Sequence, residues 1–310
     1  MYSTPDPLNR HPLAYPADEK HPELVQVFGP TWTLSTALLP GAPQQPFAEV
    51  DPAVRKGKVE EHRFRSALLG NERRIWVYTP PDYNAAEDCG LLLMFDGTQY
   101  LRIHQATTVL DNLIAARQIS PTVAVCVDAL ETFTVRKKEL LFNETFVASV
   151  ATEILPWLHT RYRFTSDPRR SVIGGASLGG LAAALVAFRH PELFGNVISQ
   201  SGAFNYGVPG ESDPEAFARL IDASPALPLR FSLDAGRFEG LLAGTTVNED
   251  HNPGIVVANR HLDMLLRAKG YEVTYHEFAG AHDFVGWTIT FPDHLRRLMA
   301  PVEGGRKING

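Results

Sequence analysis

The sequence predicts an α/β fold with a mostly parallel central sheet, helices on both of its faces, and an N-terminal antiparallel hairpin. Short apolar runs alternate with segments of helical spacing along residues 59–300. This alternation is typical of a parallel sheet that is covered by helices on both sides. The runs "GLLLMFDG" and "TVAVCVDA" are short and continuously apolar up to their last residues, which indicates strands buried on both faces.

The expected elements can be placed in chain order. Residues 62–70 and 73–81 form the hairpin, with a turn at Gly70-Asn71. The spacing of residues 143–162 predicts a helix that Asn143 caps and Pro156 kinks. We expect the other strands at 90–97, 122–129, 169–175, 194–202, 227–236 and 271–278, and the other helices at 98–118, 178–190, 259–270 and near 291–299.

Composition limits the class of function. The chain of 310 residues is 44% hydrophobic and 21% charged, with a formal net charge of −6. The charge argues against nucleic-acid binding. The polar, proline-rich N-terminus lacks the apolar core of a secretory signal, and no run of about 18 apolar residues predicts a membrane span. We therefore expect a cytoplasmic protein without membrane or nucleic-acid partners.

The two cysteines, Cys89 and Cys126, suggest neither a disulfide framework nor a metal site. No cofactor or metal is expected. The domain organisation follows from periodicity: residues 1–58, rich in proline, form an extended arm or a reduced N-terminal region. Residues 59–300 form the α/β domain, and residues 301–310 form a flexible tail.

The stretch "SVIGGASLGG" places Ser177 among small residues, between a predicted strand and a predicted helix. The spacing Gly175-x-Ser177-x-Gly179 fits a nucleophile elbow, in which the serine occupies the strained apex of a strand-to-helix turn. A Gly/Ser loop is the alternative interpretation, because this short motif also arises by chance. The residues downstream must decide between the two.

A nucleophilic serine needs a histidine base that a carboxylate orients. In doubly wound hydrolases these residues follow in the order serine, acid, histidine, on loops at the carboxyl ends of strands. His282 follows one predicted strand, and both Asp234 and Glu239 follow an earlier one. We assign His282 as the base. Glu239 is favoured as the acid because it sits one loop step further on, whereas Asp234 could brace the turn.

The oxyanion of a tetrahedral intermediate requires two backbone N–H donors. Leu178, directly after the serine, should supply one of them. Thr98, or alternatively Gly97, should supply the other from the loop after "LLLMFDG". That loop can equally be an ordinary turn in which Asp96 caps the next helix, and both interpretations can hold together.

From about Glu60 to Met299 the chain resembles the enterochelin (ferric enterobactin) esterases, within the esterase D and feruloyl esterase group of α/β-hydrolases. The resemblance rests on "RSALLGNERRIWVYTPPDY", "LLMFDGTQYL", "VRKKELLFNETF", "GGASLGGLAA", "GRFE" and "NRHLDMLLRAKGYEVTYHEFAGAHDFVGW". It implies an α/β-hydrolase fold and an ester substrate, such as a siderophore trilactone that carries iron. The family's nucleophile falls on Ser177, its histidine on His282 and its acidic position on Glu239.

Two departures bear on the substrate. Family members carry a folded N-terminal domain of well over a hundred residues, whereas about 58 residues precede the catalytic region here. The loop "GLLAGTTVNEDHNPG" after Glu239 is longer than in the cytoplasmic enzymes. Specificity for a bulky trilactone is therefore less firmly implied than ester hydrolysis.

Two further residues are candidates for substrate binding. Arg136 falls where the family places an arginine near the substrate, and a guanidinium suits an anionic catecholate or carboxylate. Its alternative role is a surface salt bridge with Glu139. Trp287 could line the pocket or fill the core. The leading hypothesis is a serine esterase; acyl transfer, feruloyl or acetyl ester hydrolysis, and a non-catalytic binding protein are the alternatives.

Overall fold

The computed structural model describes residues 13–16, 31–34, 45, 47–84, 89–129, 133–239 and 254–301. A central sheet of eight strands organises this part of the chain. Its strands are β3 (Lys58–Ser66), β4 (Asn71–Thr79), β5 (Gly90–Phe95), β6 (Thr122–Val127), β7 (Ser171–Ala176), β8 (Asn196–Gln200), β9 (Arg230–Gly236) and β10 (Glu272–Phe278).

The strand order is β10-β9-β8-β7-β5-β6-β4-β3. The strands from β10 to β6 are parallel, whereas β4 pairs antiparallel with β6 and β3 pairs antiparallel with β4. Every residue of β5, β6, β7 and β8 is buried, as expected for central parallel strands. The predicted mostly parallel sheet with an antiparallel hairpin is confirmed.

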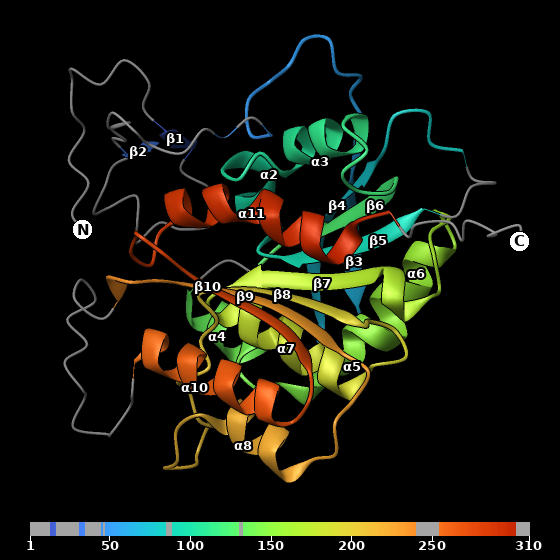
Figure 1. Cartoon of the computed structure of the whole chain (residues 1–310). Coiled ribbons are helices and arrows are strands. Elements are labelled where there is room, and N and C mark those ends of the chain that lie inside the picture. The colour runs from blue at the N-terminus through green and yellow to red at the C-terminus, as the bar shows by residue number, and fades with distance from the viewer. Residues whose placement is uncertain are drawn as a thin grey trace, which may run out of the picture.

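Helices cover both faces of the sheet (Figure 1). The helical elements are α2 (Gly97–Arg102), α3 (Ala106–Ala115), α4 (Phe133–Leu140), α5 (Glu144–Ser149), the π-helical η1 (Val150–Ile154), α6 (Leu155–His159), the 3-10 turn η2 (Pro168–Arg170), α7 (Leu178–Arg189), α8 (Ala216–Ala223), α10 (Ile255–Ala268) and α11 (Phe284–Met299). In Figure 1, α2, α3 and α11 lie on one face, and α4, α5, α7, α8 and α10 lie on the other.

Two buried apolar clusters correspond to the two faces of the sheet. Along β5, Leu91, Leu93 and Phe95 belong to the cluster shared with α5, α7 and α10. Leu92 and Met94 belong to the cluster shared with α3 and α11. The alternation follows from the two-residue period of side chains in a strand. Each face of the sheet therefore packs against its own layer of helices.

Several elements differ from the sequence prediction. The helix expected over 98–118 is divided into α2 and α3, with Gln105 between them in the left-handed region at φ 48°. The hairpin turn occupies residues 67–70 instead of Gly70-Asn71, and Gly70 takes φ 66° there. The last helix begins at Phe284, well before residue 291, because the Asp283 carboxylate accepts hydrogen bonds from the N–H groups of Val285 and Gly286.

The predicted cap of the helix over 143–162 is confirmed, since the Asn143 side chain accepts a hydrogen bond of 3.0 Å from the Phe146 N–H. The irregularity expected from Pro156 takes the form of the π-helical turn η1, which precedes α6. Proline has no N–H to donate to the carbonyl four residues earlier and its ring crowds the preceding turn, so the hydrogen-bond pattern changes just before Pro156.

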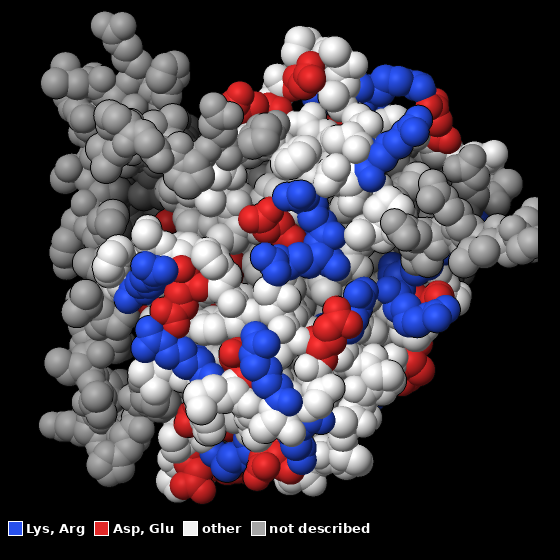
Figure 2. All heavy atoms as spheres, viewed as in Figure 1, with Lys and Arg blue, Asp and Glu red and all other residues white. Residues whose placement is uncertain are grey.

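The N-terminal region contains β1 (Leu13–Pro16) and β2 (Thr31–Leu34), which pair antiparallel. Most of the predicted arm of residues 1–58, the loop 240–253 and residues 302–310 of the predicted tail lie outside the described residues, so the domain boundaries stay a prediction. Within the described part, no helix is both long and apolar enough to cross a membrane. On the face viewed in Figure 2, basic and acidic side chains are interspersed without a large patch of one sign.

Candidate active site

Ser177 lies between β7 and α7 with a strained backbone, at φ 58° and ψ −122°. Non-glycine residues rarely adopt such angles, and they do so where the surroundings enforce them. Here the Ser177 N–H donates to the Gln200 carbonyl at 2.9 Å, and the Ser177 carbonyl accepts from the Ala203 N–H at 3.0 Å. The turn is thus fixed from the neighbouring strand, which is the geometry of a nucleophile elbow rather than of a loose Gly/Ser loop.

The glycines around Ser177 permit a close approach of strand and helix. A Cβ atom on Gly175 would lie 2.6 Å from the carbonyl carbon of Gly179. A Cβ atom on Gly180 would lie 2.4 Å from the Ser199 hydroxyl. Backbone atoms cannot move away, so position 175 requires glycine, whereas a side chain at position 180 would require Ser199 to shift. The small residues of "SVIGGASLGG" therefore have a packing reason as well as a chemical one.

His282 and Glu239 form a hydrogen-bonded pair at the carboxyl edge of the sheet. The His282 Nδ1 atom lies 3.0 Å from Glu239 Oε2. The glutamate side chain is 1% exposed, whereas the histidine side chain is 31% exposed. Within the described residues, His282 Nε2 and the Ser177 hydroxyl have no hydrogen-bond partner, and no hydrogen bond joins the two residues to each other. The hydrogen bond between a nucleophilic serine and its histidine often forms fully only when the substrate binds.

The other oxygen of Glu239 is held by two donors. Glu239 Oε1 accepts hydrogen bonds from the Gly236 N–H, at 2.6 Å, and from the Ser201 hydroxyl. The Ser201 oxygen in turn accepts a hydrogen bond of 2.8 Å from Trp287 Nε1. Sequence reasoning missed Ser201 and Gly236. They could have been found from their position at the carboxyl ends of β8 and β9, because these ends lie at the same edge of the sheet as Ser177.

Trp287, a predicted substrate-binding residue, is 4% exposed and lies against His282. Its ring packs edge-to-face on His282, with 4.8 Å between the ring centroids. Together with the hydrogen bond to Ser201, this contact gives Trp287 a supporting position beside His282 and leaves little of its surface for a substrate.

Asp234, the alternative acid, is fully buried and bound elsewhere. Its Oδ2 atom accepts from the Thr290 hydroxyl at 2.5 Å and lies 2.8 Å from His294 Nε2. Its Oδ1 atom accepts from the Ser201 N–H at 3.1 Å. Asp234 therefore joins β9 to α11 and to the end of β8, and the geometry favours Glu239 as the partner of His282.

The predicted oxyanion donors lie at the starts of two helices. Leu178 is the first residue of α7, a twelve-residue helix, and its N–H is at the positive end of the helix dipole. Thr98 lies in the first turn of α2, just after β5. Neither backbone N–H has an acceptor among the described residues. Gly97 packs closely on β6, since a Cβ there would lie 2.8 Å from the Cys126 carbonyl carbon.

Asp96 does not cap α2, contrary to the sequence expectation, because its side chain makes no capping hydrogen bond. The carboxylate is bound instead by Arg136, whose Nε and Nη2 atoms each donate to it at 2.6 Å. Arg136 Nη2 also donates to the Ala176 carbonyl at 3.3 Å. Burial acts to lower the pKa of Arg136, but the neighbouring Asp96 carboxylate outweighs it and raises the pKa.

The expected alternative salt bridge between Arg136 and Glu139 is wrong. Glu139 pairs with Arg73 at 2.7 Å, and both side chains are buried. The Arg136 side chain is 15% exposed and connects the loop after β5 to the elbow. It therefore holds the two candidate oxyanion donors in a fixed relation. Within the described residues, no group of three or more His, Cys, Asp or Glu residues could hold a metal ion.

The strained serine, the glutamate-bound histidine and the parallel sheet together define an α/β-hydrolase. The match of the Esterase family model to residues 66–298 narrows this class, and the chain belongs to that family. The resemblance to enterochelin esterases seen in the sequence is confirmed by the relatives that follow.

The chain is 30% identical over 271 residues to the iron(III) enterobactin esterase of Escherichia coli O6:H1 (strain CFT073), covering 87% of this chain and 64% of that protein. It is 28% identical to the iron(III) enterobactin esterase of Dickeya dadantii, covering 86% and 62%. The crystal structure of the enterobactin esterase FES from Shigella flexneri in the presence of enterobactin superimposes with a TM-score of 0.72 at 29% identity, covering 86% and 64%. The chain thus spans less than two thirds of these relatives' length.

Proposed function

We propose that this protein is a serine esterase that hydrolyses carboxylic esters through an acyl-enzyme, with Ser177 as nucleophile, His282 as base and Glu239 as orienting acid. One observation carries the proposal. A strained serine stands at the same edge of the sheet as a partly exposed histidine, whose Nδ1 is bound to a buried carboxylate while its Nε2 is unoccupied. This arrangement suits proton transfer between a serine hydroxyl and a histidine.

The reaction follows from these positions. His282 Nε2 accepts the hydroxyl proton as Ser177 Oγ attacks the carbonyl carbon of the ester. The Leu178 and Thr98 N–H groups donate to the oxyanion that forms. When the intermediate collapses, the imidazolium returns its proton to the departing alcohol. Water, activated by the same histidine, then releases the acid and restores Ser177. Glu239 holds the Nδ1–H tautomer and stabilises the imidazolium.

For the substrate we propose a siderophore trilactone of the enterochelin type, or a related aryl or polyol ester. Three relatives with 26–30% identity are named for iron(III) enterobactin or iron(III) salmochelin, which supports this choice. Iron would enter as part of the substrate. Acyl transfer and hydrolysis of feruloyl or acetyl esters use the same residues and stay alternatives. The cytoplasmic location also stays a prediction.

A hydrolysis screen tests both the chemistry and the substrate. The purified chain and its Ser177→Ala variant are incubated with ferric and iron-free trilactones, feruloyl esters and p-nitrophenyl acetate, and the products are identified by mass spectrometry. We expect hydrolysis of at least one ester by the wild type and only background by the variant. Equal activity of the two proteins would refute Ser177 as the nucleophile, and binding without hydrolysis would favour the binding-protein alternative.

A further inference from the structure

Two buried carboxylates flank the loop that carries Thr98, a candidate oxyanion donor. Asp96 directly follows β5, and Asp128 directly follows β6. These strands are parallel neighbours with Phe95 opposite Val127, so the two aspartates lie side by side at the carboxyl edge of the sheet. They are 5% and 4% exposed and border a common cavity of about 10 Å³, which is far too small for a substrate group. Their contacts within the protein therefore define their role.

Asp128 holds the side chain of Thr98. The Thr98 hydroxyl donates to Asp128 Oδ1 at 2.7 Å. Asp128 Oδ2 accepts from Nε and Nη2 of Arg74, at 3.1 and 2.9 Å. The Asp128 N–H also donates to the Arg74 carbonyl at 3.1 Å. Because Arg74 belongs to β4, the carboxylate is anchored to the sheet and cannot turn without breaking one of these bonds.

The bond to Asp128 decides which group of Thr98 can bind an oxyanion. A hydroxyl has one hydrogen to donate, and that of Thr98 is directed at the carboxylate. The Thr98 N–H has no acceptor among the described residues. The Asp96 carbonyl accepts instead from the N–H groups of Gln99 and Tyr100, at 2.9 and 3.3 Å. The hydroxyl of Thr98 therefore acts as a tether, and its backbone N–H is the available donor.

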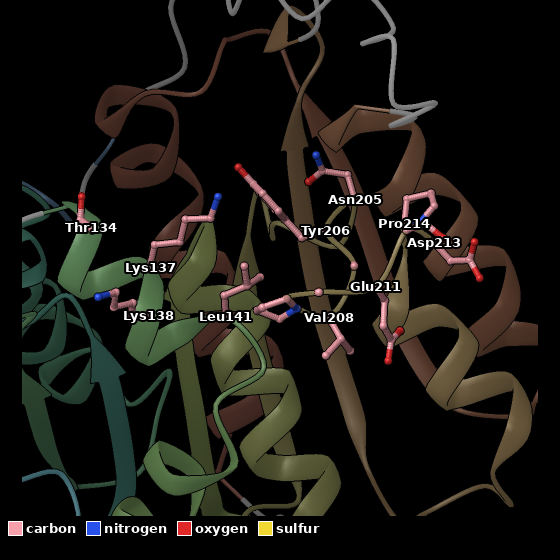
Figure 3. Close-up of a pocket in the computed structure, with 14 residues that line it drawn as sticks. Thr134, Lys137, Lys138, Leu141, Asn205, Tyr206, Val208, Glu211, Asp213 and Pro214 are labelled. Carbon is pink, nitrogen blue, oxygen red and sulfur yellow. The ribbon is translucent and has the colours of Figure 1, made fainter.

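The beginning of this loop is strained and held separately. Asp96 has φ 58° and ψ 49°, in the left-handed region, which a non-glycine residue keeps where its surroundings enforce it. Two N–H groups of Arg136 bind its carboxylate, each at 2.6 Å. The next residue of α4, Lys137, instead borders a separate pocket of about 590 Å³, where its ammonium lies 4.9 Å from the centre of the Tyr206 ring (Figure 3). Arg136 thus fixes the first residue of the loop, and Asp128 fixes its end.

We propose that Asp128 is a positioning residue of the oxyanion hole, which aims the Thr98 N–H at the oxyanion by holding the Thr98 hydroxyl. The proposal rests on the proposed function, in which this N–H stabilises the oxyanion formed at Ser177. A donor that is fixed before the reaction stabilises the developing charge without having to reorganise. A donor on an untethered loop loses part of that effect.

The charges around the loop are compatible with this role. A bare carboxylate close to a developing oxyanion would oppose the negative charge. Here each carboxylate has its own guanidinium, since Asp128 pairs with Arg74 at 2.9 Å and Asp96 pairs with Arg136 at 2.6 Å. Asp128 can therefore orient the donor while the neighbouring arginine offsets its charge.

The test is steady-state kinetics of the full chain with p-nitrophenyl acetate. Thr98→Val keeps the shape of the side chain and removes the hydroxyl, and Thr98→Ala serves as a second variant without it. We expect kcat to fall by between about tenfold and about 10³-fold, the upper limit being complete loss of an oxyanion donor. KM should stay near the wild-type value, because the N–H acts on the transition state. Thr98→Ser restores a hydroxyl and should recover most of the lost rate.

A double-variant cycle tests whether Asp128 acts through Thr98. Asp128→Ala should lower kcat to a similar extent, and its combination with Thr98→Val should lose little more than either single variant. Thr122→Val is the matched control. Thr122 is a buried threonine at the opposite end of β6, and its hydroxyl donates to the Ser120 carbonyl at 2.8 Å. Its replacement should lower the melting temperature and leave kcat unchanged.

Wild-type kcat in the folded Thr98→Val and Thr98→Ala proteins would overturn the proposal. So would a raised KM at unchanged kcat, multiplying losses in the double variant, or an equal loss of kcat in Thr122→Val. Circular dichroism checks that each variant is folded. Ser177→Ala, assayed alongside, separates the two proposals. If it loses activity while Thr98→Val keeps it, only the positioning role is wrong, whereas activity in Ser177→Ala refutes the esterase mechanism and the positioning role with it.

Discussion

Two histidine–carboxylate pairs lie near each other in this protein, and they differ in what surrounds them. His282 pairs with Glu239 at 3.0 Å, and His294 pairs with Asp234 at 2.8 Å. Asp234 lies near the end of β9, and Glu239 lies just beyond that strand. His282 lies just before α11, and His294 lies within it. The His282 side chain is 31% exposed, whereas that of His294 is 5% exposed.

The buried pair even forms part of a serine–histidine–aspartate chain. Ser232 Oγ lies 2.7 Å from His294 Nδ1, and His294 Nε2 lies 2.8 Å from Asp234 Oδ2. These residue types and contacts match a catalytic triad, yet all three residues are buried. Both ring nitrogens of His294 are occupied, so none is available for a substrate proton. Access and an open nitrogen therefore distinguish the candidate catalytic pair, and residue composition does not.

The largest expected effect is on turnover at the exposed pair. His282→Ala should lower kcat by at least about 10⁴-fold and leave the melting temperature near the wild-type value, since it removes a partly exposed base. Stopped assays with p-nitrophenyl acetate measure this loss. The double variant with Ser177→Ala should lose little more, because the two residues act as a unit. A further large drop would contradict the assignment.

The buried pair should respond in the opposite way. His294→Ala leaves the Asp234 carboxylate buried without its histidine and should destabilise the fold by about 3–5 kcal/mol. Urea denaturation followed by circular dichroism measures the change. The folded fraction should retain most of its kcat. A stable but inactive His294→Ala protein would mean that the buried pair takes part in the chemistry.

The two acids can be compared directly. Glu239→Gln should lower kcat by about 10⁴-fold, because an amide at Nδ1 favours the wrong tautomer of His282 and does not stabilise the imidazolium. Asp234→Asn should mainly reduce stability. Steady-state kinetics and thermal melts of both variants distinguish the roles. If Asp234→Asn loses activity while Glu239→Gln keeps it, the orienting acid is Asp234.

A third histidine shows what burial without a carboxylate does. His104 is 1% exposed, its Nδ1 lies 2.8 Å from the Thr288 hydroxyl, and burial lowers its pKa from 6.5 to about 3. The unfolded state therefore binds a proton that the folded state excludes, so this residue's contribution to stability is lost as pH falls from 6.5 toward 3. Between pH 6.5 and about pH 5 the loss of unfolding free energy should be about 2 kcal/mol.

Urea titrations of the wild type and of His104→Gln at both pH values test this effect. The free energy of unfolding should depend less on pH in the variant, and an equal dependence in the two proteins would exclude His104 as the cause.

The smallest expected effect concerns the support of Glu239. Ser201→Ala removes a hydroxyl that donates to Glu239 Oε1 and leaves the Gly236 N–H as the remaining donor. We expect about a tenfold loss of kcat, corresponding to one hydrogen bond to a charged group. The pH profile of kcat separates positioning from mere destabilisation, because a loosened carboxylate should shift the profile and an unrelated packing defect should not.

Much of the fold could be predicted from the sequence. Strand positions followed from continuous apolar runs, and the elbow, His282 and Glu239 followed from the order of polar residues at strand ends. These features are local, because side-chain period and turn chemistry act over a few residues. The prediction of a single helix over 98–118 was wrong, because the backbone of Gln105 takes the left-handed region and divides the segment. The prediction that the last helix lies near 291–299 was also wrong, because Asp283 caps α11 and starts it at Phe284.

The partners of charged groups required the tertiary structure. The sequence by itself determined that Ser177, an acid and a histidine lie at the ends of three different strands of a parallel sheet, and so meet at one edge. Which acid faces which histidine, that Arg136 binds Asp96 rather than Glu139, and that Lys137 meets Tyr206 were decided only by packing. The physical reason is that these contacts join segments up to about seventy residues apart along the chain. Their distances depend on how helices pack on the sheet, and a local pattern carries no information about that packing.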